Sequence, residues 1–281
     1  MLPRAVTTCL LALMLATLPP APSGAAEEPA LKLEGKGGDW RLDLFLPAGD
    51  GPFPVAIFIP GCDGWDAWTR HSAFMHREAL AAAGWGIAQL LLLVNGGVLS
   101  ATACDKNDQV PALSAPAALA ATEAAVLLAA DSRVDAGRLV VLGQSFGANV
   151  GLELASPSRR AAAGIKTRLA AILAFYPWCE DSYGTEGTAD FDTPVLVLIG
   201  ELDAWAPVSR CLPLAEAQAA RAGAPPFRIE VFPGSHHWFD YDRLPQMILR
   251  TGDPLSIIAG NPEQAARSRQ VYLAWLADLL P

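Results

Sequence analysis

Ser145 lies in a pattern that is typical of a serine nucleophile. Residues 143–147 read Gly-Gln-Ser-Phe-Gly and lead from an apolar, strand-like stretch directly into a helical one. Glycines on both sides of the serine permit the sharp strand-to-helix turn that exposes such a hydroxyl. A glycine-rich turn with an incidental serine is the alternative, and the placement between a clear strand and a clear helix disfavours it.

A serine hydroxyl is a poor nucleophile, so this interpretation requires a histidine as general base and an acid that orients the histidine. Candidates follow two later strand-like stretches. Glu201 and Asp203 come after the first stretch, and His236 and His237 come after the second. The chain order serine, acid, histidine is the order that accompanies a serine on such a turn. Together these residue types would perform acyl transfer.

Alternating strands and helices are predicted to position these residues. Strands are predicted at residues 31–34, 40–46, 55–59, 86–94, 138–142, 169–175, 194–199 and 227–232, and helices at 74–83, 115–130, 148–155, 214–222 and 262–280. The first two strands form a hairpin, and the alternation that follows indicates an α/β fold, with a mostly parallel central sheet covered by helices on both faces. Because sites on such sheets lie at the carboxyl ends of the strands, the candidate residues are expected at one edge of the sheet.

Three segments of the chain resemble the motif blocks of the dienelactone hydrolase family. They are residues 143–148 (GQSFGA), 200–203 (GELD) and 232–239 (FPGSHHWF). The resemblance spans roughly residues 55–239 and implies the α/β-hydrolase fold. It also selects Asp203 over Glu201 as the orienting acid and His237 over His236 as the general base, with Ser145 as the nucleophile.

The resemblance further implies an oxyanion hole. The early loop that supplies one donor in this family usually begins His-Gly, and it corresponds here to residues 60–64, Pro-Gly-Cys-Asp-Gly. The backbone N–H groups of Cys62 and Phe146 are therefore expected to bind the developing oxyanion. The enzyme that gives the family its name uses a cysteine nucleophile, whereas this chain has Ser145, so the family name does not imply the substrate.

Cysteine pairing is expected if the protein is exported. Four of the five cysteines follow the N-terminal leader described below, and they allow three connectivities. The family resemblance favours the pairs Cys62 with Cys104 and Cys179 with Cys211.

Tryptophans gather near the predicted site. Trp65, Trp178, Trp205 and Trp238 fall just after strands or beside the candidate catalytic residues. Each one alone could merely pack beneath a loop, but together they suggest an aromatic-lined substrate pocket. The short segment between Cys179 and the next predicted strand leaves no room for a large cap domain. The long irregular stretch at residues 95–114 is expected to border the cleft.

A metal site is the alternative for the remaining polar residues. His71, His76, His236, Asp63 and Asp66 are possible ligands, but the five-residue separation of His71 and His76 does not place them on one helix face. A polar helix face near the surface is the favoured interpretation, and no metal or other cofactor is expected.

The N-terminus resembles a secretory signal peptide. A basic start, a short apolar run and a small-residue stretch predict cleavage near Ala26, leaving residues 27–281 as a single domain in the periplasm or outside the cell. The apolar run is shorter than the roughly 20 residues that a membrane-spanning helix needs. The formal net charge of −9 argues against nucleic acid and anionic membrane surfaces as partners.

The residues and the resemblance together lead us to expect an esterase that acts on small to medium, largely neutral carboxylic esters or lactones. A peptidase or polyester depolymerase on the same fold is the nearest alternative. A non-catalytic periplasmic binding protein is a further alternative, which the complete set of serine, acid and histidine disfavours. The oligomeric state does not follow from the sequence.

Overall fold

The computed structural model describes residues 29–35, 39–94, 97–98, 110–179, 189–249 and 256–281. The side chains of residues 93, 94, 97, 98, 110–113, 115 and 249 are also outside this description. The predicted signal peptide, Cys104 and most of the stretch predicted to border the cleft therefore lie outside the described residues.

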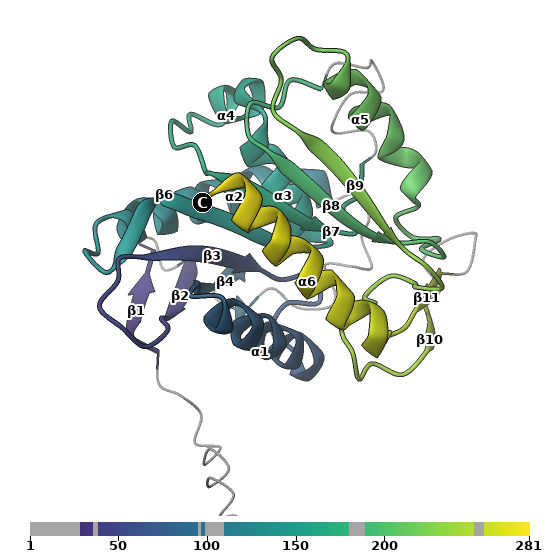
Figure 1. Ribbon diagram of the computed structural model, residues 1–281, viewed down its shortest axis with the longest axis horizontal. Coiled ribbons are helices and arrows are strands. Elements are labelled where there is room, and N and C mark those ends of the chain that lie inside the picture. The colour runs from purple at the N-terminus through teal and green to yellow at the C-terminus, as the bar shows by residue number, and fades with distance from the viewer. Residues whose placement is uncertain (1–28, 36–38, 95–96, 99–109, 180–188, 250–255) are drawn as a thin grey trace, which may run out of the picture.

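A twisted sheet forms the centre of the molecule (Figure 1). Its strand order is β1-β2-β4-β3-β6-β7-β8-β9, with β5 paired to β4. The first two strands and β5 join antiparallel, whereas β4, β3, β6, β7, β8 and β9 run parallel to one another. The strands are β1 Leu31–Glu34, β2 Trp40–Phe45, β3 Phe53–Ile59, β4 Gly86–Val94, β5 Gly97–Val98, β6 Val134–Gln144, β7 Ala171–Phe175, β8 Val195–Gly200 and β9 Phe227–Phe232.

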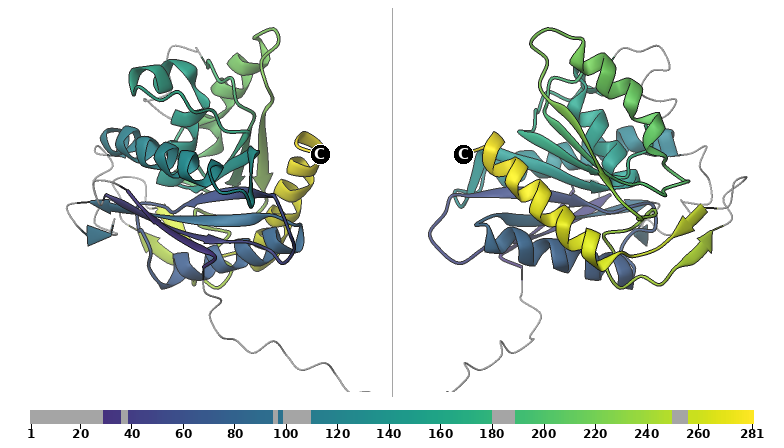
Figure 2. Two further views of the ribbon diagram at one scale, coloured as in Figure 1. Left: turned by 90° about the vertical axis from the view of Figure 1, so that its left-hand side faces the viewer. Right: turned by 45° about the vertical axis from the view of Figure 1, so that its right-hand side comes forward.

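Helices cover both faces of this sheet (Figure 2). Helices α1 (Ala67–Ala82) and α6 (Pro262–Leu279) lie on one face, and α2 (Val110–Ala129) and α3 (Phe146–Ala155) lie on the other. Helix α4 (Pro157–Ala162) follows α3, the 3₁₀ helix η3 (Val208–Arg210) precedes α5 (Leu212–Ala219), and α5 packs against β9. The predicted α/β architecture is confirmed.

The strands that are covered on both faces are apolar along their whole length. Every residue of β7 and of β8 is buried, because helices exclude water from both sides of the pleat. Strand β9 lies at the edge of the sheet and is mostly half-buried or exposed. This difference explains why continuous apolar runs, rather than alternating ones, predict the central strands.

Two helices begin earlier than the sequence suggests. Helix α1 begins at Ala67 rather than at residue 74, because the carboxylate of Asp66 accepts the Thr69 N–H at 2.7 Å and caps it. Helix α2 begins at Val110, so the predicted irregular stretch at 95–114 ends five residues early. A small hairpin of β10 (Met247–Leu249) and β11 (Ser256–Ile258) was not predicted, because strands of three residues leave little periodic signal.

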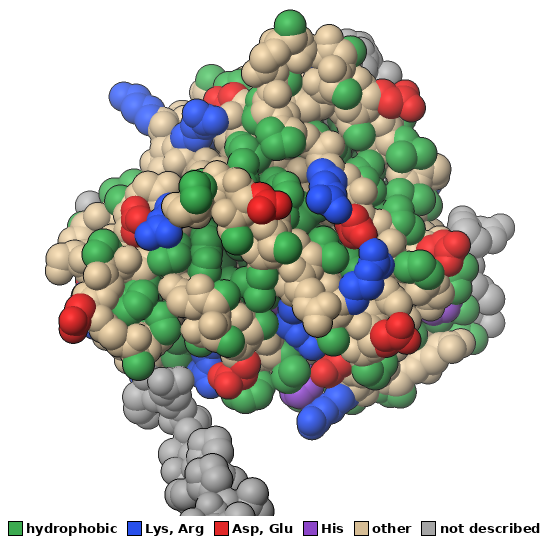
Figure 3. Space-filling model, in the orientation of Figure 1, with side chains coloured by type: hydrophobic (Ala, Val, Ile, Leu, Met, Phe, Trp, Pro, Cys, Tyr) green, Lys and Arg blue, Asp and Glu red, His purple; other side chains and the backbone are tan. Residues whose placement is uncertain are grey.

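Charged side chains of both signs are interspersed over the face that carries α6 (Figure 3). Helix α6 carries Arg267, whose guanidinium reaches Glu230 Oε1 at 2.5 Å and lies 4.9 Å from the ring centre of Phe232. The acidic excess of the chain is therefore not gathered into a single patch on the visible face. Among the residues described, no helix combines the length and apolar character needed to cross a membrane.

Candidate active site

Ser145 lies on a strained turn between β6 and α3. Its φ of 49° is in the left-handed region that few residues other than glycine adopt, and its N–H donates to the Phe175 carbonyl at 2.9 Å. The flanking glycines leave room for this turn. A Cβ at Gly143 would lie 2.2 Å from the Gly147 carbonyl oxygen, and one at Gly147 would lie 2.1 Å from the Ile59 carbonyl oxygen. The Gly-x-Ser-x-Gly spacing is therefore a steric requirement of the turn.

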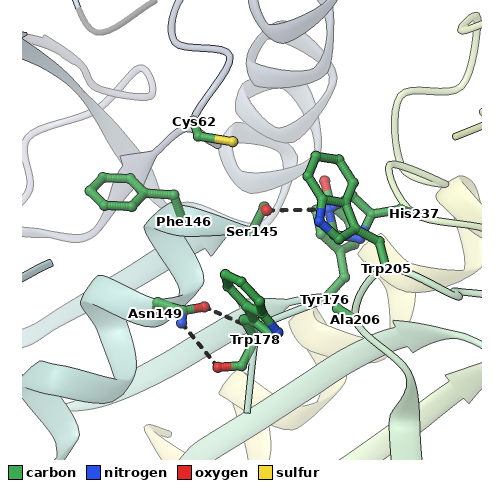
Figure 4. Close-up of a pocket in the computed structure, with 9 residues that line it drawn as sticks. All are labelled: Cys62, Ser145, Phe146, Asn149, Tyr176, Trp178, Trp205, Ala206 and His237. Carbon is green, nitrogen blue, oxygen red and sulfur yellow. Dashed lines mark hydrogen bonds between the residues drawn. The ribbon is translucent and has the colours of Figure 1, made fainter. Parts of the chain in front are cut away.

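His237 connects the serine to a carboxylate. Its Nε2 lies 3.2 Å from Ser145 Oγ (Figure 4). Its Nδ1 lies 2.7 Å from Asp203 Oδ2. A carboxylate only accepts hydrogen bonds, so Nδ1 carries the proton and Nε2 is left as the acceptor for the serine hydroxyl. The side chains of His237 and Asp203 are both buried, which shields this row of contacts from water.

The acid is held by the backbone of its own loop. The second carboxylate oxygen of Asp203 accepts the N–H groups of Trp205 at 3.0 Å and Ala206 at 2.7 Å. Glu201, the alternative acid, is exposed, and its carboxylate instead accepts the Gly234 N–H at 2.9 Å. The structure thus directs Asp203, and not Glu201, towards the histidine.

The loop that carries the base is held by the segment before α6. The carbonyl of His237 accepts the Ala259 N–H at 3.2 Å, and the carbonyl of Phe239 accepts the Asn261 N–H at 2.8 Å. His236, one residue earlier, is half-buried, and its Nδ1 lies 3.1 Å from the Leu202 carbonyl oxygen rather than at Ser145. Only one of the two adjacent rings is directed at the serine.

Cys62 and Phe146 line the cavity next to Ser145, on the side away from His237 (Figure 4). Phe146 is the first residue of α3, where a backbone N–H has no acceptor within the helix and is available to a ligand. This position fits the predicted role of an oxyanion donor.

A cavity that opens to solvent lies above Ser145, and the space between its walls, including the solvent at its mouth, is about 350 Å³. Its remaining walls are Asn149, Tyr176, Trp178, Trp205 and Ala206. Trp178 and Trp205 are therefore placed where the sequence predicts, and no lysine or arginine is among the described residues that line this cavity.

Trp65 and Trp238 do not line this cavity, which corrects their prediction as pocket residues. The indole of Trp65 donates to the Leu90 carbonyl at 3.2 Å and lies 5.6 Å from the ring of Phe58. Trp238 is stacked on Tyr241 with ring centres 5.6 Å apart. Both rings pack beneath the loops. This is the alternative stated for each tryptophan, and a position just after a strand does not exclude it.

Three residues of the cavity wall were missed by sequence reasoning: Asn149, Tyr176 and Ala206. The amide of Asn149 both donates to the Trp178 carbonyl at 3.0 Å and accepts the Trp178 N–H at 2.8 Å, so it fixes that wall (Figure 4). An asparagine inside an apolar helix, four residues after the nucleophile, was the available signal. Tyr176 is fully buried beside His237, and nothing in its sequence context marks it.

The predicted pair Cys179 and Cys211 forms a disulfide that joins the end of β7 to the start of α5. Cys62 is also disulfide-bonded, but Cys104, its predicted partner, lies outside the described residues.

The prediction of a polar, near-surface helix face is wrong for His76 and Asp63. His76 is fully buried, and Asp63 is 6% exposed. Burial raises the pKa of Asp63 to about 7, and the hydrogen bond from Thr69 only partly offsets this effect. Burial also lowers the pKa of His76, so its imidazole is neutral. His76 contacts Asp240, which lies on a distant segment of the chain.

The sheet, its helices and the turn at Ser145 define an α/β-hydrolase fold. A thermophilic esterase from Thermogutta terrifontis with bound propionate superposes with a TM-score of 0.60 at 18% identity, covering 86% of this chain and 91% of that one. A dienelactone hydrolase-like promiscuous phosphotriesterase from metagenomic libraries superposes with a TM-score of 0.63 at 20% identity, covering 85% and 92%. No curated protein sequence matches the chain.

The chain belongs to the dienelactone hydrolase family, whose model matches residues 100–280. The matched range is more than half of the chain and includes Ser145, Asp203 and His237. Membership of this family makes the chain a hydrolase of carboxylic esters.

Proposed function

We propose that the protein is a serine esterase that cleaves small to medium, largely neutral carboxylic esters or lactones through an acyl-enzyme intermediate. The observation that carries this proposal is the continuous row from Ser145 Oγ through His237 to Asp203, with contacts of 3.2 and 2.7 Å. A base aligned in this way can remove the serine proton as the hydroxyl attacks.

In the acylation step, Ser145 Oγ attacks the ester carbonyl carbon while His237 Nε2 accepts the hydroxyl proton. The bond from the carbonyl carbon to the alcohol oxygen then breaks, and Nε2 returns the proton to the leaving oxygen. Water attacks the acyl carbon in the second half-reaction and gives its proton to Nε2, and Ser145 leaves as the hydroxyl. The N–H groups of Cys62 and Phe146 would bind the oxyanion in both steps.

The walls of the cavity support a neutral substrate. Trp178, Trp205 and Phe146 offer apolar surface, and the polar amide of Asn149 is engaged by the Trp178 backbone. A substrate carboxylate bound there would lose water without gaining a cationic partner among the described lining residues. Propionate and butyrate are bound in structures of the Thermogutta terrifontis esterase, in agreement with short acyl groups on this fold.

The decisive experiment compares purified wild type with Ser145→Ala on 4-nitrophenyl esters of increasing acyl length. We expect the variant to fold normally and to lose several orders of magnitude in kcat. A fluorophosphonate probe should label the wild type at Ser145 and leave the variant unlabelled. Turnover by Ser145→Ala at the wild-type rate would contradict the proposal. Preferential cleavage of peptides or long polyesters would contradict the proposed specificity for small to medium esters and favour a peptidase or polyester depolymerase.

We also propose that residues 1–26 are a signal peptide and that residues 27–281 act as a single exported domain. The Cys179–Cys211 disulfide supports this proposal, because disulfides persist in oxidising compartments. N-terminal sequencing of protein recovered from the periplasm or medium should begin near Glu27, and recovery of the uncleaved chain from the cytoplasm would contradict it.

A further inference from the structure

A buried carboxylate lies directly beneath the candidate active site. Asp240 is completely inaccessible to solvent. Its Oδ2 accepts from Gln144 Nε2 at 2.5 Å, His76 Nε2 at 3.1 Å and Ser72 Oγ at 3.3 Å, and its Oδ1 accepts from the Tyr176 hydroxyl at 2.6 Å. Four donors are needed here because a buried carboxylate is costly unless its oxygens are satisfied.

The donors tie together the segments that carry the reacting groups. Gln144 immediately precedes Ser145, and Asp240 follows His237 by three residues on the same loop. The hydrogen bond between Gln144 and Asp240 therefore connects the turn that carries the serine to the loop that carries the base. Ser72 and His76 add helix α1 to the same carboxylate.

The protonation states make each of these bonds directional. Burial raises the pKa of Tyr176 well above its usual value, so its hydroxyl keeps the proton that it donates to Asp240. The neutral imidazole of His76 donates from Nε2 to Asp240 and accepts at Nδ1, which lies 3.2 Å from the Tyr272 hydroxyl. Burial raises the pKa of Tyr272 as well, so that hydroxyl remains a donor.

Tyr176 connects Asp240 to the base, His237, through its ring. Its ring centre lies 4.5 Å from that of His237, and the ring of Trp205 also contacts this imidazole, at 4.8 Å. The backbone of Tyr176 has a φ of 41°, a strained conformation that persists only when surrounding contacts fix it. The bond to Asp240 is one such contact, and it directs the hydroxyl away from the cavity, into the protein interior.

We propose that Tyr176 and Asp240 are positioning residues for the base. Asp240 holds the Tyr176 ring against the imidazole and ties the base loop to the serine turn, so that His237 Nε2 stays within reach of Ser145 Oγ. This inference rests on the proposed function of Ser145 and His237. Neither positioning residue exchanges a proton with the substrate.

The test compares Tyr176→Phe with Tyr272→Phe. Each variant removes one buried hydroxyl from the same network and keeps the ring, but only Tyr176 contacts His237. We expect Tyr176→Phe to lower kcat for a small neutral ester by roughly tenfold to hundredfold with little change in KM, because a small displacement of a base is sufficient for such a loss. Tyr272→Phe should keep kcat within about threefold, the effect expected of a change that does not reach the base.

A spectroscopic readout separates positioning from general destabilisation. The proton between His237 Nδ1 and Asp203 Oδ2 should give a downfield proton NMR resonance in wild type and in Tyr272→Phe, and this resonance should shift or broaden in Tyr176→Phe. Asp240→Asn is the second variant, with the same expected loss of kcat, because its amide group turns one acceptor into a donor. Thermal unfolding monitors whether each variant is folded.

Wild-type kcat and an unchanged resonance in folded Tyr176→Phe, or in folded Asp240→Asn if Tyr176→Phe does not fold, would overturn the inference. Equal losses of kcat in Tyr176→Phe and Tyr272→Phe would also overturn it, because a structural role alone predicts that result. If Ser145→Ala is inactive while Tyr176→Phe is fully active, only this inference fails. If Ser145→Ala is active, the proposed function fails.

Discussion

The rings of His236 and His237 are adjacent in the chain but reach different partners. His237 contacts Ser145 and Asp203, whereas His236 contacts the Leu202 carbonyl. The pair therefore offers a comparison within one loop, in which two identical side chains differ in direction and in burial.

His237→Ala should lower kcat by several orders of magnitude, to the level of Ser145→Ala, because the serine loses its base. His236→Ala should change kcat by no more than a fewfold. Ester hydrolysis under saturating substrate measures both effects. An inactive His236→Ala together with an active His237→Ala would show that the assignment of the base is wrong by one residue.

Asp63 predicts a pH dependence of stability. Its Oδ1 has no hydrogen-bond partner among the described residues, and burial raises its pKa from 3.8 to about 7. Between these two values the folded state binds a proton that the unfolded state has released, so the free energy of unfolding falls as pH rises from about 4 to about 7. At 1.36 kcal/mol per pKa unit, this single group accounts for a decrease of at most about 4 kcal/mol.

Asp63→Asn mimics the neutral carboxyl group and should flatten this decrease. Urea unfolding at a series of pH values measures the effect. Below about pH 4, where the wild-type carboxyl is neutral in both the folded and the unfolded state, the variant and the wild type should unfold at similar urea concentrations, and near pH 8 the variant should be the more stable of the two. If the free energies of unfolding of the variant and the wild type changed in parallel over the whole pH range, the raised pKa of Asp63 would be contradicted.

At the scale of elements, the close contact between α3 and β3 depends on Gly147. A Cβ there would overlap the backbone of Ile59, which cannot move without displacing the central sheet. Gly147→Ala should therefore cost more than the roughly 1 to 3 kcal/mol of ordinary overpacking, and the serine turn should lose its activity.

Gly164, after α4, is the control for this substitution. Its φ is +72° and nothing lies within 4 Å of an added Cβ, so Gly164→Ala should cost only about 1 to 2 kcal/mol of backbone strain and keep full activity. Chemical unfolding of both variants provides the comparison. Equal losses in the free energy of unfolding for the two variants would show that the close contact between α3 and β3 does not require a glycine at position 147.

The disulfide between Cys179 and Cys211 connects two walls of the cavity. Trp178 precedes the first cysteine, and Trp205 lies on the loop that leads to the second. The cross-link closes a separation of 32 residues, for which chain entropy predicts a stabilisation of about 3 to 4 kcal/mol.

The double variant Cys179→Ser/Cys211→Ser should lose about this amount of stability. The KM of the variant should rise above the wild-type value for esters with aromatic groups and should rise less for acetates, because Trp178 and Trp205 are no longer held together. Denaturation and steady-state kinetics measure the two effects. The two hydrogen bonds between the Asn149 amide and the Trp178 backbone remain in the variant, so kcat for acetates should be preserved. Unchanged stability would argue against the entropic contribution of the cross-link.

For the whole molecule, the sequence predicts the central strands well because each is covered on both faces and reads as one apolar run. The three residues of the proposed triad are also marked in the sequence: Ser145 and Asp203 follow such runs, whereas His237 follows the edge strand β9 and is marked by its motif. Their catalytic roles stay a prediction that the distances support.

What the sequence did not predict depends on contacts between distant segments. The partner of His76 is Asp240, 164 residues later, and helical periodicity alone cannot show which polar residues meet such a partner. The same reason explains why Tyr176 was missed and why Trp65 and Trp238 were placed in the pocket. The hairpin of β10 and β11 is too short for its pattern to be distinguished from that of a loop.

The backbone bonds that hold the base loop have a consequence for how the enzyme can be observed. The amide hydrogens of Ala259 and Asn261 are protected only while they donate to His237 and Phe239. Their exchange with deuterated solvent therefore reports each opening of the catalytic loop, without a substrate, a label or a substitution in the site. Two peptides from the region before α6, followed by mass spectrometry, would give the free energy of that opening directly.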